Sequence, residues 1–186
     1  MSFHREAFVD PQAGPVEAAC AGRLLPLLLA QDGSTTRLCD TIAGEPVTLQ
    51  LLHQAVTTEV PAVVHDALPG TRFIERITSL AAHGQVMMDN LSYIALEGIN
   101  PLLRQELEAG RTPIGHLLPR LWVRRETVTD ADALHDRLWR TVGTPDPAAA
   151  RAYRILTPDG PCMLIAETYR RGMLMAMPSA APSPAS

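Results

Sequence analysis

Two charged residues stand inside apolar stretches of this 186-residue chain. Arg76 lies within residues 71–80 and Glu167 within residues 162–170, and both stretches are rich in β-branched and apolar side chains, which predicts strands. A charge in apolar company needs a partner of opposite sign, supplied by the protein or by a ligand. For 71–80 alone, the commoner case is an edge-strand arginine whose head reaches water.

Hydroxyl groups and a proline-led helix start provide further candidates. Asp32 and Gly33 predict a turn, and Ser34 and Thr35 follow it, which suits a helix N-cap or a ligand-binding loop. Capping is the commoner role of such hydroxyls. Residues 112–115, with the sequence TPIG, predict a helix start whose first N–H groups could hold an anion, although a plain turn between two helices is the better explanation from these residues alone.

Other kinds of site are not indicated. The chain has no glycine-rich phosphate loop, no nucleophile elbow and no zinc-ligand spacing, so we expect neither a metal nor a cofactor. A net charge of −4 argues against a nucleic-acid partner, and the apolar stretch at 24–30 is too short to span a membrane. Three scattered cysteines and the lack of a signal peptide predict a cytoplasmic protein.

The elements that must position these residues follow from the residue patterns. Strands are predicted over 47–56, 71–80, 86–96, 121–128, 152–157 and 162–170, and helices over 16–30, 36–43, 100–110, 112–118 and 131–142. Short turns join several strands, which favours antiparallel pairing. We therefore expect an α+β fold with a six-stranded antiparallel sheet, in one domain over 16–175 with flexible termini at 1–15 and 176–186.

Three blocks of the sequence together resemble the chorismate pyruvate-lyase family, whose members form 4-hydroxybenzoate. The blocks are LLAQDGSTTR at 28–37, RFIER at 72–76 with TPIG at 112–115, and the terminal segment from 152 to Glu167. The similarity covers about residues 24–171. It implies a sheet with helices inserted as flaps over a buried ligand pocket, and a small aromatic or cyclohexadiene carboxylate as substrate.

The resemblance also implies roles for single residues. Arg76 matches the arginine that grips the ring carboxylate, and Glu167 matches the glutamate that meets the ring hydroxyl and acts as acid–base group. The first flap would contain Ser34 and Thr35. Backbone N–H groups would come from Ile114 and Gly115.

One departure from the family pattern concerns the pyruvyl carboxylate. The ubiquinone-pathway lyases hold it with an arginine, and the position aligned with that arginine here is Leu91. Arg154 or Arg125 could replace the missing cation. Leu91 supports an alternative in which the fold serves as a lyase, dehydratase or cyclase on a secondary metabolite, and a third hypothesis is an aromatic-acid-binding protein without catalysis.

Overall fold

The protein, represented by a computed structural model, is described here for residues 3–97, 99, 101–109, 113–114 and 123–175. Its centre is a six-stranded sheet in the order β1-β2-β3-β6-β5-β4, in which all neighbouring strands are antiparallel. This confirms the predicted α+β fold. The strands are β1 (Thr48–Thr57), β2 (Phe73–Ala82), β3 (Gln85–Ala95), β4 (Arg124–Thr127), β5 (Ala150–Thr157) and β6 (Gly160–Tyr169).

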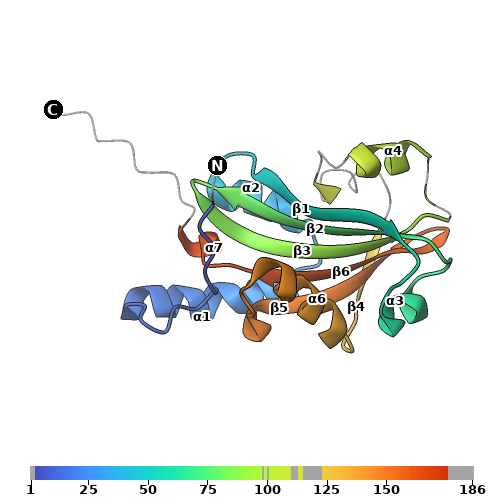
Figure 1. Cartoon of the computed structure of the whole chain (residues 1–186). Coiled ribbons are helices and arrows are strands. Elements are labelled where there is room, and N and C mark those ends of the chain that lie inside the picture. The colour runs from blue at the N-terminus through green and yellow to red at the C-terminus, as the bar shows by residue number, and fades with distance from the viewer. Residues whose placement is uncertain (1–2, 98, 100, 110–112, 115–122, 176–186) are drawn as a thin grey trace.

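Helices precede the sheet and interrupt its strand sequence (Figure 1). The longest precedes β1, and a short one follows β6. The helices are α1 (Pro15–Ala30), α2 (Thr35–Ala43), α3 (Ala62–Ala67), α4 (Pro101–Ala109), α6 (Asp132–Val142) and α7 (Gly172–Met175), with a 3-10 turn, η2, at Pro147–Ala149.

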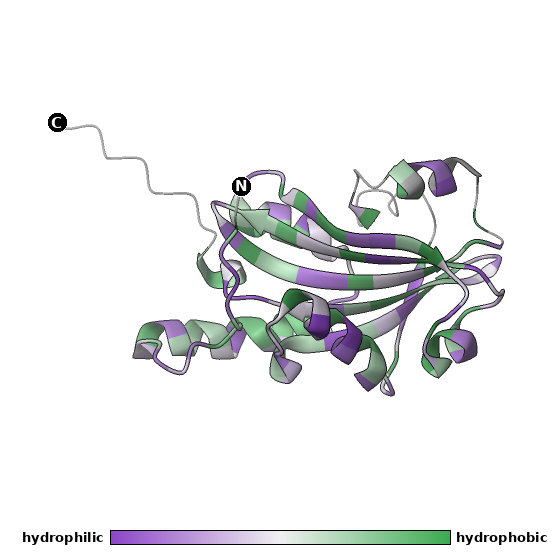
Figure 2. Cartoon of the chain, in the orientation of Figure 1, coloured by the Kyte–Doolittle hydropathy of each residue, from purple (hydrophilic) through white to green (hydrophobic). Residues whose placement is uncertain are grey.

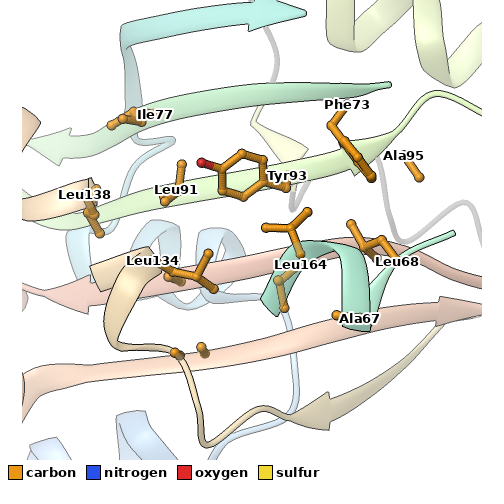
Figure 3. Packing of buried hydrophobic residues seen from close by; sticks show 14 of the residues in the cluster. Ala67, Leu68, Phe73, Ile77, Leu91, Tyr93, Ala95, Leu134, Leu138 and Leu164 are labelled. Carbon is orange, nitrogen blue, oxygen red and sulfur yellow. The ribbon is translucent and has the colours of Figure 1, made fainter. Parts of the chain in front are cut away.

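One face of the sheet packs against α3 and α6. Leu91 and Leu164 of the strands meet Leu134 and Leu138 of α6 and Leu68 beside α3 in one apolar cluster (Figure 3). All five side chains are buried, as expected for a sheet face covered by amphipathic helices.

The opposite face is covered at its two ends by two other clusters. At one end Met88 and Tyr169 pack with side chains of α1, α2 and α7. At the other end Ile74 and Ile94 pack with Leu107 of α4. Purple bands interrupt the green along the central strands, which carry polar residues between apolar ones (Figure 2). Three of these polar residues, Thr78, Asn90 and Glu167, lie side by side in the middle of this face.

A β-bulge in the hairpin of β2 and β3 decides which side chains reach that face. His83 and Gly84 adopt positive φ values of 49° and 79° at the turn, and Ala82 pairs with Gln85. The register then shifts between Leu80 and Ala81, so that Arg76 lies opposite Ser92. A shift of one residue exchanges the two faces of a strand, and it governs the whole remainder of β3.

The N-terminal segment is part of the folded structure. Phe8 is fully buried in the cluster with Met88, and Arg5 contacts the buried carboxylate of Asp89 at 3.1 Å. The prediction of a flexible segment at 1–15 is therefore wrong for these residues, because their burial and ion pairing hold them against the sheet. The predicted flexible end at 176–186 lies outside the described residues.

No helix within the described ranges is long and apolar enough to cross a membrane.

Candidate active site

Polar side chains form a row across four adjacent strands. Thr78 of β2 lies opposite Asn90 of β3, Asn90 lies opposite Glu167 of β6, and Glu167 lies opposite Arg151 of β5. Directly opposed residues in an antiparallel sheet point to the same face. The row therefore lies in the middle of the face between the two apolar clusters.

A cavity of about 40 Å³ opens over this row. The lining combines sheet residues with residues of the two insertions, and includes Arg76, Thr78, Asn90, Glu167, Thr35 and Ile114. The structure thus brings Arg76 and Glu167 to one cavity, together with two of the predicted binding residues.

Arg76 lies two residues before Thr78 on β2, so both side chains are on the same face, and only 1% of Arg76 is exposed. Strand β2 is flanked by β1 and β3, so the edge-strand interpretation is wrong. Burial lowers the pKa of the Arg76 guanidinium, since a charged group loses hydration in the interior. The result is a buried guanidinium in the wall of a cavity.

Glu167 is held by three side chains. Its Oε1 accepts a hydrogen bond from the hydroxyl of Tyr153 at 2.7 Å, and its Oε2 accepts from Nε of Arg151 at 2.9 Å and from the hydroxyl of Thr35 at 3.1 Å. Burial raises the pKa of Tyr153 well above its usual value, and the nearby Glu167 carboxylate raises it further. Tyr153 is therefore a neutral hydrogen-bond donor to Glu167.

Arg151 is the buried counter-ion of Glu167, with an N–O separation of 2.9 Å. Burial alone would lower the pKa of Arg151, but the charge and hydrogen bond of Glu167 together with Tyr169 and Tyr153 outweigh it, and the pKa is raised. The same guanidinium donates to the Leu28 carbonyl at 3.1 Å and to the Thr35 hydroxyl at 3.0 Å. Arg151 therefore ties the α1–α2 junction to the carboxylate in the cavity.

The remaining flap candidates have different placements. Ser34 caps α2, and its hydroxyl oxygen accepts from the backbone N–H of Arg37 at 3.4 Å. It is not among the residues that line the cavity, whereas Ile114 is. Gly115, and with it most of the predicted helix at 112–118, lies outside the described residues.

Leu91 lies on the opposite face of the sheet, so its predicted place in the pocket is wrong. Its side chain is fully buried beside Leu134 and Leu138 of α6 (Figure 3). Uninterrupted pairing from the hairpin turn would place Leu91 opposite Arg76, but the bulge places Ser92 there. The β3 residue that lines the cavity is Asn90.

Arg154 is also outside the cavity, which corrects its predicted binding role. Its guanidinium pairs with Glu126 on β4 at 2.7 Å, and 37% of its side chain is exposed. Alternation along β5 explains this placement, because Tyr153 and Ile155 face the cavity side and Arg154 between them faces away. Arg125 of β4, by contrast, lines the cavity.

Sequence reasoning did not identify Arg151, Tyr153 and Asn90 as site residues. Strand β5 begins at Ala150, two residues before its predicted start, so the predicted strand did not contain Arg151. Tyr153 and Ile155 alternate correctly in the sequence and could have indicated an inward tyrosine. Asn90 could be found only by predicting the bulge, for which the sequence carries no strong signal.

Among the described residues, no group of three His, Cys, Asp or Glu side chains could hold a metal ion.

Comparison with solved structures finds distant likenesses. PhnF from Mycobacterium smegmatis is 12% identical with a TM-score of 0.47, and the alignment covers 93% of this chain and 87% of that one. The possible transcriptional regulator YydK from Bacillus subtilis is 11% identical with a TM-score of 0.44, with 93% and 84% covered. No curated protein matches the sequence significantly.

A family model gives a more specific result. The model described as chorismate pyruvate-lyase Rv2949c-like matches residues 29–176. This range contains all the described residues that line the cavity. The chain belongs to the Rv2949c-like chorismate pyruvate-lyase family.

Proposed function

We propose that the protein is a lyase that converts chorismate to 4-hydroxybenzoate and pyruvate without a cofactor. The observation that carries the proposal is that a buried cation, Arg76, and a buried carboxylate, Glu167, line the same cavity. These groups match the two polar ends of 4-hydroxybenzoate, a ring carboxylate and a hydroxyl. Membership of the family supports the same assignment.

In this assignment Arg76 binds the ring carboxylate, and Glu167 binds the ring hydroxyl. A carboxylate offers about four acceptor positions, and the described contacts use Oε1 of Glu167 only once. Oε1 therefore retains capacity for a ligand hydroxyl. Arg151, Thr35 and Tyr153 hold the carboxylate in place. They therefore fix the point at which the ligand hydroxyl binds.

The reaction is an elimination. The bond between the ring carbon and the ether oxygen breaks, and the neighbouring ring carbon, which bears the hydroxyl, loses its hydrogen as a proton. The ring becomes aromatic, which drives the reaction, and the released enolpyruvate gains a proton on its methylene carbon to become pyruvate. In this proposal Glu167 accepts the ring proton, in the role of a general base.

A second candidate function is binding of an aromatic acid without turnover. The contacts around Glu167 favour it, because hydrogen bonds from Arg151, Thr35 and Tyr153 are equally consistent with a carboxylate that positions a ligand and takes no proton. The alternative of lyase, dehydratase or cyclase chemistry on a secondary metabolite has lost the support that Leu91 gave it, since Leu91 lies on the far face of the sheet.

The test is an assay of purified protein with chorismate in which both products are quantified. We expect equal amounts of pyruvate and 4-hydroxybenzoate, and a loss of kcat/KM of about 10- to 150-fold for Arg76→Gln, because a charge-assisted hydrogen bond contributes roughly 1.5–3 kcal/mol. Glu167→Gln should lower kcat. Pyruvate release no faster than in buffer would refute the lyase, and tight 4-hydroxybenzoate binding would then favour the binding protein.

A further inference from the structure

We propose that Arg125 forms a second carboxylate site in the cavity and binds the carboxylate of the enolpyruvyl side chain. This inference rests on the proposed function, which requires a dicarboxylate substrate. The arginine expected from the family resemblance is absent at the aligned position, and neither Leu91 nor Arg154 faces the cavity. The described lining of the cavity contains two arginines, Arg76 and Arg125.

The two arginines approach the cavity from opposite sides. Arg76 lies on β2 and Arg125 on β4, with β3, β6 and β5 between them. Arg125 pairs with Ile155, whose side chain belongs to the apolar cluster on the cavity face, so both arginines belong to one face. A ligand with two carboxylates can therefore lie across the row of Asn90 and Glu167 and meet one cation at each end.

The guanidinium of Arg125 has an edge that can receive a carboxylate. Its Nη1 donates to the Asp32 carbonyl at 2.7 Å, which fixes the side chain against the α1–α2 loop. Its Nε is buried and has no hydrogen-bond partner within the described part of the chain. A buried donor without a partner is costly, and a carboxylate bound at the edge formed by Nε and Nη2 would satisfy it.

The location of Arg125 also agrees with the structure of chorismate. The guanidinium lies 5.7 Å from the centre of the Tyr153 ring, and the hydroxyl of Tyr153 contacts Glu167. Arg125 is thus at the Glu167 side of the cavity, away from Arg76. The ether side chain and the hydroxyl occupy adjacent carbons of the chorismate ring, so a substrate whose hydroxyl meets Glu167 carries its second carboxylate to this side.

The other arginines near the site are committed elsewhere. Arg151 is occupied by Glu167, Thr35 and the α1 carbonyl groups. Arg154 is paired with Glu126 on the far face. Arg125 is the arginine left for this role among those of the described strands β4 and β5.

Two ligands that differ only in the second carboxylate arm test the inference. The probes are 4-hydroxybenzoate and its non-reactive 3-(carboxymethoxy) derivative, and their affinities are measured by calorimetry for the wild type, Arg125→Gln, Arg125→Lys and Arg154→Gln. We expect the wild type to bind the dicarboxylate more tightly. Arg125→Gln should weaken dicarboxylate binding about 10- to 150-fold and change 4-hydroxybenzoate binding by less than about twofold.

The control variants separate charge recognition from a structural role. Arg125→Lys keeps the charge and should retain part of the preference for the dicarboxylate, while Arg154→Gln should behave as the wild type. Equal weakening of both ligands by Arg125→Gln, no weakening of either, or a wild type without preference would each overturn the inference. A wild type that prefers the dicarboxylate yet releases no pyruvate from chorismate would refute the lyase and leave the Arg125 site standing.

Discussion

Glu167 receives its hydrogen bonds from side chains of two elements, α2 and β5. Thr35 reaches it from the start of α2, and Tyr153 and Arg151 reach it from β5. Only 3% of the Glu167 side chain and 11% of the Arg151 side chain are exposed, so little water screens the pair. The carboxylate that the proposed chemistry needs is therefore also part of the folded framework.

Removal of the Arg151 charge should destabilise the fold strongly. Arg151→Met leaves Glu167 as a buried charge without its counter-ion, which typically costs about 3–5 kcal/mol in the free energy of unfolding. Urea denaturation measures this change. Arg154→Met is the matched control, because its partner Glu126 is much more exposed and such a pair contributes about 1 kcal/mol or less.

The second arm of this experiment adds Glu167→Gln to Arg151→Met. Neutralising the stranded carboxylate should recover part of the lost free energy of unfolding. Equal losses for Arg151→Met and Arg154→Met, or no recovery in the double variant, would contradict the view that the buried ion pair is a closely coupled unit.

At the scale of the elements, most of the fold followed from local patterns. Alternation of apolar residues in β2 and β6 predicted that Arg76 shares its face with Ile74, and Glu167 with Ile165, and the structure agrees. The hairpin turn at Gly84 was equally readable. These features depend on residues close together in the chain, so a single sequence contains them.

The errors about the site came from features that depend on pairing between strands. The bulge between Leu80 and Ala81 moved Leu91 to the far face, and nothing local marks it. The two extra residues at the start of β5 brought Arg151 opposite Glu167, and they are set by pairing with β6. Register is a property of two strands, so one misplaced residue changes which side chains form the site.

Helix α6 gives a prediction about pH. Burial lowers the pKa of His135 below its usual 6.5, its ring stacks on Trp139, and its Nε2 lies 3.2 Å from the backbone oxygen of Arg151. Between the lowered pKa and 6.5 the unfolded chain binds a proton that the folded chain does not. The contribution of His135 to stability is thus complete above 6.5 and declines as the pH falls below it.

The measurement is the free energy of unfolding of the wild type and of His135→Gln from pH 8 to pH 5. Subtracting the two curves removes the titration of the other groups. We expect the wild type to lose its advantage over the variant as the pH falls below about 6.5. A difference between the two proteins that stays constant over this range, or grows on acidification, would contradict the assignment.

At the scale of the whole molecule, the sheet serves two purposes on its two faces. The face under α3 and α6 carries an apolar cluster and the buried carboxylates of Glu75 and Asp89, which are paired with arginines. The other face has a polar middle with a cavity, and its ends are closed by α1, α2, α7 and α4. The N-terminal segment with Phe8 adds to one of these ends. A ligand in the cavity therefore touches residues from most of the chain, and binding should stabilise the whole fold.

This coupling can be measured with three ligands that test the two ends of the cavity separately. Benzoate has the carboxylate for Arg76 but no hydroxyl for Glu167, phenol has the hydroxyl alone, and 4-hydroxybenzoate has both. Stabilisation follows RT ln(1 + [ligand]/Kd), or about 2.7 kcal/mol at 100 times Kd. At equal concentration we expect the melting temperature to rise most with 4-hydroxybenzoate, less with benzoate and least with phenol, because the charge-assisted contact is the stronger one.

In Arg76→Gln the advantage of benzoate over phenol should disappear, and in Glu167→Gln the advantage of 4-hydroxybenzoate over benzoate should shrink. Equal shifts for all three ligands in the wild type would mean that the cavity recognises only the aromatic ring, and would remove the basis for assigning Arg76 and Glu167 to its two ends.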